Sequence, residues 1–188
     1  MAKPSESLAR LLAVLDRLEI PYAVCGSVAS SVHGIPRTTL DEDMLVDLKA
    51  ELRDQHIDEL ASEPAGDFYA DTGLIREAFA RGRAANLIHL ETTWKFDLFP
   101  LQGDVYSRVG FGRRSFRLVR PDGGAVLECA VISAEDTVLR KLEWCRARGE
   151  TSERQWNDLR GICRVVSAGL DVGYLRKWAG ALRWRIYY

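Results

Sequence analysis

A positive net charge, paired cysteines and long apolar runs are all missing from this sequence, and each absence excludes a class of protein. The net charge is −1 at pH 7, so no global basic field is available to hold a nucleic acid, which would need a local basic patch. No apolar run approaches the roughly 18 residues that a membrane helix needs. The first residues, MAKPSESLARLL, also lack the apolar stretch of a signal peptide. We therefore expect a cytoplasmic protein with no membrane association.

Cysteine is sparse and scattered. The four cysteines are Cys25, Cys129, Cys145 and Cys163, with no CxxC pair and no histidine at zinc spacing. Small secreted domains that are stapled by disulfides use cysteine more densely, so we expect reduced thiols of a cytosolic protein.

The remaining composition is that of an ordinary globular protein, with 47% hydrophobic and 28% charged residues. Hydrophobic periodicity and turn residues predict helices at 5–19, 28–33, 49–62, 72–81, 133–147, 152–167 and 172–182. They predict strands at 22–25, 40–48, 68–69, 86–91, 94–99, 115–119 and 125–131. The rest of 102–120, rich in Gly and Arg, is predicted to be a loop. The pattern indicates an α/β (α+β) mixed-sheet domain over residues 1–131 and a C-terminal helical subdomain over 132–188.

Gly26 and Ser27 stand between a predicted strand and a predicted helix. Glycine lets the backbone approach a ligand closely, the serine hydroxyl can donate, and a helix N-terminus favours an anion. The pair therefore indicates a phosphate-binding turn, although a plain structural turn has the same sequence.

Three acidic residues follow in Asp41-Glu42-Asp43. In a strand, residues i and i+2 face the same side, so Asp41 and Asp43 present two carboxylates together. Like charges in this arrangement are unfavourable unless a cation lies between them, so the spacing suits a divalent metal, although an acidic surface loop can have the same sequence.

Asp97 lies within the apolar run Trp94-Lys-Phe-Asp-Leu-Phe99, which should be a central strand. A carboxylate there must be paired or must bind metal. The alternative to a metal ligand is an ion pair with a nearby Arg or Lys.

Together these features resemble the polymerase-beta-like nucleotidyltransferase superfamily. Its signature is an apolar residue, Gly, then Gly or Ser, a helix, an Asp-x-Asp strand and a third Asp on a later strand. The matching residues are Val24-Cys25-Gly26-Ser27, Leu40-Asp41-Glu42-Asp43-Met44 and Asp97. The resemblance implies a minimal nucleotidyltransferase fold and transfer of a nucleoside monophosphate from an NTP to an acceptor hydroxyl.

Further segments resemble a bacterial branch similar to the toxins of abortive-infection (type IV) toxin–antitoxin pairs. They are Ile20–Ser27, His33–Thr39, Asn86–His89, Lys141–Trp144 and Ser152–Asp158, and the likeness runs from about Leu8 to Trp178. It implies an antitoxin partner and an RNA, tRNA or protein acceptor. Lys141 and Asp158 match the Lys and Asp positions of the toxins, and Lys141 is expected to contact phosphate.

The superfamily resemblance also assigns roles to the signature residues. Gly26 and Ser27 are expected to hold the β- and γ-phosphates of an NTP such as ATP. Asp41 and Asp43 are expected to bind two Mg²⁺ or Mn²⁺ ions, and Asp97 to complete one metal site and act as the base for the attacking hydroxyl.

Other residues leave alternatives open. Arg37 and Thr38, just before the acidic strand, could contact the triphosphate or acceptor, or belong to a solvated loop. A basic stretch interleaved with aromatic residues could grip RNA, or face solvent. Its arginines are Arg108, Arg113, Arg114, Arg117 and Arg120.

Position 42 is usually apolar in the signature, because it points away from the metals into the core. Glu42 would therefore be a third, buried acid or lie at an exposed strand edge. It favours one alternative to an active enzyme, a catalytically impaired module that binds nucleotide or a partner. A small-molecule (antibiotic) nucleotidyltransferase is the other alternative.

Overall fold

The computed structural model describes residues 4–62, 66–121, 125–147 and 152–185. Within these ranges seven strands form one mixed sheet in the order β3-β4-β5-β2-β1-β7-β6. The strands are β1 (Tyr22–Val24), β2 (Asp41–Val46), β3 (Phe68–Tyr69), β4 (Ala85–His89), β5 (Lys95–Pro100), β6 (Ser115–Val119) and β7 (Leu127–Val131). The helices are α1 (Pro4–Arg17), α2 (Gly26–His33), α3 (Arg53–Ser62), α4 (Thr72–Ala80), α5 (Val105–Gly112), α6 (Ala134–Ala147), α7 (Glu153–Val166) and α8 (Val172–Arg185). The predicted α/β class is confirmed.

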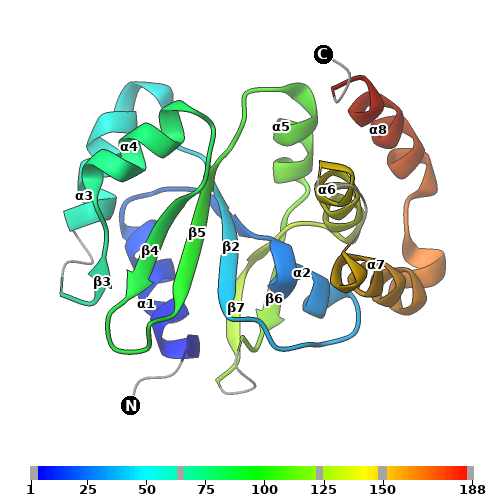
Figure 1. The fold of residues 1–188 in the computed structure, drawn as a ribbon, viewed down its shortest axis with the longest axis horizontal. Coiled ribbons are helices and arrows are strands. Elements are labelled where there is room, and N and C mark those ends of the chain that lie inside the picture. Colours follow the sequence, from blue (N-terminus) through cyan, green and yellow to red (C-terminus); the bar gives the residue numbers. More distant parts are fainter. Residues whose placement is uncertain (1–3, 63–65, 122–124, 148–151, 186–188) are drawn as a thin grey trace.

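The two central strands, β2 and β5, run parallel, and both neighbours of this pair run antiparallel to it. Parallel neighbours need a long crossover connection, and the chain between β2 and β5 includes α3, β3, α4 and β4. Figure 1 shows α4 beside β4 and β5 on one side of the molecule, and α2, α6 and α7 on the other.

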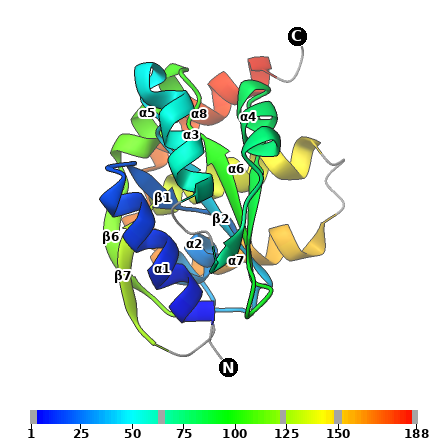
Figure 2. The same cartoon turned by 90° about the vertical axis from the view of Figure 1, so that its left-hand side faces the viewer.

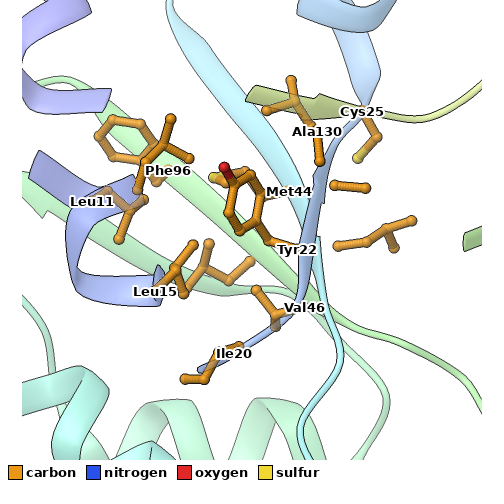
Figure 3. Close-up of a cluster of buried hydrophobic side chains, with 14 of the residues drawn as sticks. Leu11, Leu15, Ile20, Tyr22, Cys25, Met44, Val46, Phe96 and Ala130 are labelled. Atoms are coloured by element: carbon orange, nitrogen blue, oxygen red, sulfur yellow. The ribbon is translucent and has the colours of Figure 1, made fainter. Parts of the chain in front are cut away.

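The buried face of the sheet is covered by the leucine stripe of α1. Leu11 and Leu15 are fully buried and lie with Met44, Val46 and Phe96 in one apolar cluster (Figure 3). The view along the sheet in Figure 2 shows α1 on one side of the strands and α4 and α6 on the other. Because alternate residues of a strand face opposite sides, the residues between these core positions point to the other face.

The prediction of a loop was wrong for residues 105–112. They form α5, even though two glycines lower its helix propensity. The carboxylate of Asp104 caps the helix by accepting a hydrogen bond from the backbone N–H of Ser107 at 3.0 Å. Tyr106 and Phe111 are buried, so tertiary packing stabilises this helix.

The C-terminal helices pack against the sheet domain at several points. α6 and α7 contact α2, and Trp178 of α8 packs against Tyr106 of α5 with ring centroids 5.3 Å apart. Arg113 adds an ion pair to Glu135 at 3.0 Å. The division at residue 132 into two domains stays a prediction. Among the described helices, none combines the length and the apolar character that a membrane crossing requires.

Candidate active site

Three carboxylates lie on the face of the sheet opposite α1. Asp43 of β2 stands directly opposite Asp97 of β5 in the parallel pair, and Asp41 stands opposite Lys95. Asp41, Asp43 and Asp97 are all partly exposed, whereas the residues next to them, Glu42 and Phe96, are buried. The strand register therefore places Asp41 and Asp43 on one face with Asp97 beside them, as the sequence predicted.

The carboxylates are close enough to affect one another's ionisation. Burial, together with the negative charges of Asp41 and Asp97, raises the pKa of Asp43 to about 6. Crowded carboxylates of this kind favour either a proton or a cation between them.

Two of the three carboxylates are held by neighbouring side chains. The hydroxyl of Thr39 donates to Asp41 Oδ1 at 2.9 Å. The Nζ atom of Lys95 lies 2.8 Å from Asp97 Oδ2 and 4.0 Å from Asp41 Oδ2. Asn86 of β4 donates to the other oxygen of Asp97. Within the part of the chain that the structure describes, no three acidic, His or Cys side chains converge as a ready-made metal site.

The turn at Gly26 lies directly against Asp43. The backbone N–H of Cys25 donates to the carbonyl of Asp43 at 2.8 Å, which joins the turn to β2. Gly26 has a φ of +56°, and a Cβ atom there would lie 1.8 Å from Asp43 Oδ2. No other residue type fits at this position without displacing the carboxylate. The close approach places the N-terminus of α2 beside the acidic strand.

A hydrogen-bonded chain connects this turn to the C-terminal helices. Arg37 donates from Nη2 to the hydroxyl oxygen of Ser27 at 2.6 Å, and from Nε and Nη2 to the two carboxylate oxygens of Asp158 at 2.7 and 2.9 Å. Lys141 donates to Asp158 Oδ2 at 2.7 Å and to Gln155 at 2.8 Å. Burial alone would raise the pKa of Asp158, but the hydrogen bonds from Arg37 and Lys141 outweigh it and hold that pKa below its usual range.

A cavity of about 350 Å³ opens between the turn and α6, and we refer to it as the α6 cavity. It is lined by Cys25, Gly26, Ser27, Asp43, Leu45, Phe99, Ile132, Thr137, Arg140, Lys141, Glu143, Trp144 and Gln155. Two cationic side chains and a helix N-terminus therefore share its wall with one of the carboxylates. An anion with an attached apolar group suits this lining.

Solved structures with the same fold are nucleotidyltransferases. The antibiotic-resistance factor ANT(2'')-Ia has a TM-score of 0.59 and 13% identity, covering 96% of this chain and 91% of that chain. The chain has a nucleotidyltransferase fold. The lincosamide antibiotic adenylyltransferase LnuA has a TM-score of 0.50 and 15% identity, covering 85% of this chain and 96% of that chain.

A third solved structure agrees with the other two. It is a nucleotidyltransferase-like protein from Paracoccidioides brasiliensis, with a TM-score of 0.53 and 19% identity, covering 85% of this chain and 74% of that one. No family model and no curated protein matches the sequence.

Within this nucleotidyltransferase fold, most residues singled out by sequence lie together. Gly26, Ser27, Asp43 and Lys141 line the α6 cavity, and Arg37 is bonded to Ser27. Thr38 is not part of the group, because it is exposed and only its carbonyl accepts a hydrogen bond, from Arg37.

Several residues near the site were missed by sequence analysis. Asn86 and Lys95 hold Asp97, and Arg140 and Trp144 line the cavity. Lys95 carries a signal in the sequence, since it precedes Asp97 by two residues on one strand and so shares its face. Arg140 and Trp144 lie four residues apart on one helix, the spacing that places two side chains on the same face.

Glu42 is fully buried, and neither of its carboxylate oxygens has a hydrogen-bond partner among the described residues. Burial, with the charge of Asp43 as a second cause, raises the pKa of Glu42 to about 8. Of the two alternatives that the sequence left open for Glu42, the structure therefore shows the buried acid and not the exposed strand edge.

The arginine-rich stretch does not form one open basic surface. Arg108 is paired with Asp47 at 2.7 Å, Arg113 stacks over the ring of Tyr174 at 4.0 Å, and Arg114 stacks over Phe111 at 4.1 Å. Arg117 and Arg120 are exposed, at the edge of the sheet farthest from β4. The stretch therefore serves largely to fasten α5 to its neighbours.

Proposed function

We propose that this protein is a nucleotidyltransferase that moves a nucleoside monophosphate from an NTP to an acceptor hydroxyl. One observation carries the proposal. The backbone of the Gly26–Ser27 turn lies against Asp43, which stands in register with Asp97, at the mouth of a cavity lined by Lys141. Phosphoryl transfer needs a phosphate cradle and metal-binding carboxylates side by side, and these residues supply both.

The carboxylates suit Mg²⁺ or Mn²⁺ by charge and by position. Carboxylate oxygens are hard ligands of the kind that these ions prefer, and a cation would relieve the repulsion that raises the pKa of Asp43. Lys95 already places a positive charge between Asp97 and Asp41. Asp41 and Asp43 would hold the ions, and Asp97 would join them by exchanging Lys95 for metal.

The chemical step is an in-line displacement at the α-phosphorus. The acceptor oxygen forms a bond to this phosphorus, the bond to the bridging oxygen of the β-phosphate breaks, and pyrophosphate leaves. Asp97 takes the hydroxyl proton at a carboxylate oxygen. The bound ions supply Lewis-acid charge that offsets the charge of the phosphates. The Gly26–Ser27 turn and Lys141 hold the phosphates, and Arg37 orients Ser27.

Thermal unfolding with each NTP tests the proposal. NTP should raise the melting temperature only when Mg²⁺ is present, and a double variant, Asp41→Ala with Asp43→Ala, should lose that gain. Radiolabelled NTP incubated with the protein, Mg²⁺ or Mn²⁺ and cell extract should then label an RNA, a protein or a small molecule. No NTP-dependent stabilisation under any metal condition would refute the assignment.

A catalytically impaired nucleotide-binding or partner-binding module is the second candidate. Two features favour this candidate, because both oppose assembly of the carboxylates around a metal. They are the buried Glu42 within the acidic strand and the Lys95–Asp97 ion pair. Stabilisation by NTP without metal, and no label transfer, would select this candidate.

The acceptor has three candidates. The resemblance of the sequence to abortive-infection toxins favours RNA, tRNA or protein and would add an antitoxin partner. One solved structure of ANT(2'')-Ia contains adenylyl-2''-tobramycin, which favours an antibiotic acceptor. The labelling experiment separates these acceptors by the fraction that carries the label.

A further inference from the structure

A second cavity lies on the same face of the sheet, on the side away from the α6 cavity. This α4 cavity has a volume of about 400 Å³. Its lining residues come from α4, β4, β3 and the turn between α4 and β4 (Figure 1). The residues that matter here are Tyr69, Leu74, Arg81, Arg83, Asn86 and Ile88.

The α4 cavity is continuous with the acidic site through the strand register. Asn86 stands opposite Asp97, which stands opposite Asp43. Asn86 lines the cavity and also donates a hydrogen bond to Asp97. The carboxylate expected to take the acceptor proton is thus one residue away from the cavity wall.

A second row of residues runs parallel to the first. Tyr69 stands opposite Ile88, Ile88 opposite Lys95, and Lys95 opposite Asp41. The floor from the acidic site to the α4 cavity is therefore one uninterrupted sheet face.

The geometry points to the α4 cavity as the binding site of the acceptor, and to a nucleotide unit at the end of a single-stranded RNA as that acceptor. The inference rests on the proposed function. In-line transfer requires the attacking hydroxyl and the leaving pyrophosphate on opposite sides of the α-phosphorus. With the phosphates held at the Gly26–Ser27 turn and Lys141, the open side is that of Asp97 and Asn86.

The lining favours a nucleotide over a wholly apolar acceptor. Tyr69 is 54% exposed and Leu74 is 60% exposed, so both offer apolar surface on which a base can stack. The guanidinium of Arg83 is exposed, and no hydrogen bond or ion pair of it occurs among the described residues, so it can bind a phosphate.

The two acids of the cavity are already engaged. Glu77 pairs with Arg81 at 2.9 Å, and Asp71 caps α4 by accepting from the backbone N–H of Leu74 at 2.8 Å. Asp71 keeps its negative charge, so the four charged side chains of the lining sum to zero, and the guanidinium of Arg83 is the cation that remains open to a ligand. One base with its phosphate matches this open guanidinium and the aromatic surface of Tyr69.

A binding experiment tests this assignment. The probe is a mixed-sequence oligoribonucleotide of eight residues with a 5′-fluorescein and a free 3′-hydroxyl, titrated at low salt without NTP and followed by fluorescence anisotropy. Tyr69→Ala and Arg83→Glu should each weaken binding about tenfold. The control Arg117→Glu makes the same charge change on the distant edge strand β6, and should alter affinity less than about twofold.

Three results would overturn the inference: no binding of the probe to the unmodified protein, equal binding by all variants, or loss of binding in Arg117→Glu but not in Arg83→Glu. The last would place RNA on β6. Thermal shift by Mg²⁺ and NTP in the same variants separates this failure from failure of the proposed function. Tyr69→Ala and Arg83→Glu should keep that shift, and its absence from the unmodified protein would sink the proposed function whatever the RNA does.

Discussion

The two faces of strand β2 carry acids in very different environments. On the face toward α6, Asp41 and Asp43 lie among the Thr39 hydroxyl, the Lys95 ammonium and a helix N-terminus. On the face toward α1, Glu42 lies in an apolar core with no hydrogen-bond partner among the described residues. The first face can exchange a proton for a cation, whereas on the second only a proton can neutralise the charge.

The largest expected effect comes from neutralising an acid on the face of β2 toward α6, which we refer to as the open face. Asp43→Asn should reduce nucleotidyl transfer by roughly a thousandfold, since removing one preorganised electrostatic group at a reacting centre costs on the order of 10²–10³ in rate. The melting temperature without ligand should stay the same or rise, because repulsion by Asp41 and Asp97 is relieved. Rate assays with labelled NTP, with circular dichroism as the folding control, check both halves. An unimpaired rate would remove Asp43 from the active site.

Removing the acid on the buried face should raise the stability of the protein in a pH-dependent way. With a folded-state pKa of about 8 and an unfolded value near 4.5, Glu42 takes up a proton on folding at any pH between these two values. The resulting loss in the free energy of unfolding is absent below about pH 4.5, grows as the pH rises from there to about 8, and levels off above that pH. Glu42→Leu should therefore stabilise the protein by on the order of a few kcal/mol at pH 8 and by much less at pH 4.5.

Urea unfolding of this variant at both pH values gives the measurement. The partly exposed Glu59→Leu in α3 is the control and should show no such pH-dependent gain. A Glu42→Leu gain that is the same at pH 4.5 and pH 8 would contradict the assignment of a buried, protonated acid.

Gly26→Ala should disturb the open face through its backbone. The φ of +56° and the close approach to Asp43 Oδ2 predict a loss of about 2 kcal/mol in the free energy of unfolding, together with loss of stabilisation by Mg²⁺ and NTP. Gly180→Ala is the matched control, because a Cβ at that helical position would meet no atom from elsewhere in the described residues within 4 Å. It should be neutral or slightly stabilising. Denaturant midpoints of both variants decide the point.

The smallest effect concerns pH and the metal. Asp43 has a pKa of about 6 without metal, so its carboxylate is available to a cation above that pH and is increasingly protonated below it. The Mg²⁺ concentration needed for half of the NTP-dependent thermal shift should rise about fivefold between pH 6 and pH 5. A flat profile over this range would show that Asp43 is not a ligand.

Sequence patterns predicted most of the fold, because its strands and helices agree with local periodicity. The i, i+2 spacing of Asp41 and Asp43 was enough to place both on one face, and Asp97 was found from its apolar flanks. The pattern could also tell that Glu42 points inward. It could not tell that the position is fully closed, because closure depends on α1, which is distant in the chain.

Other features depend on tertiary contacts and stayed hidden. Residues 105–112 lack helix-forming composition and are held by the burial of Tyr106 and Phe111. The partners of Arg108 and Arg113 lie on other elements, so a basic stretch in sequence becomes a set of internal ion pairs. The α4 cavity is formed by elements whose individual sequences give no sign of it.

Asp158 places a buried carboxylate beside the α6 cavity, bonded to Arg37 and Lys141. Its carboxylate balances Arg37 and Lys141, so under the proposed function a triphosphate would replace one negative partner of these side chains with another. The affinity would then reflect the difference between carboxylate and phosphate as partners, and a ligand with several charged oxygens would compete with this bidentate carboxylate better than a single anion would.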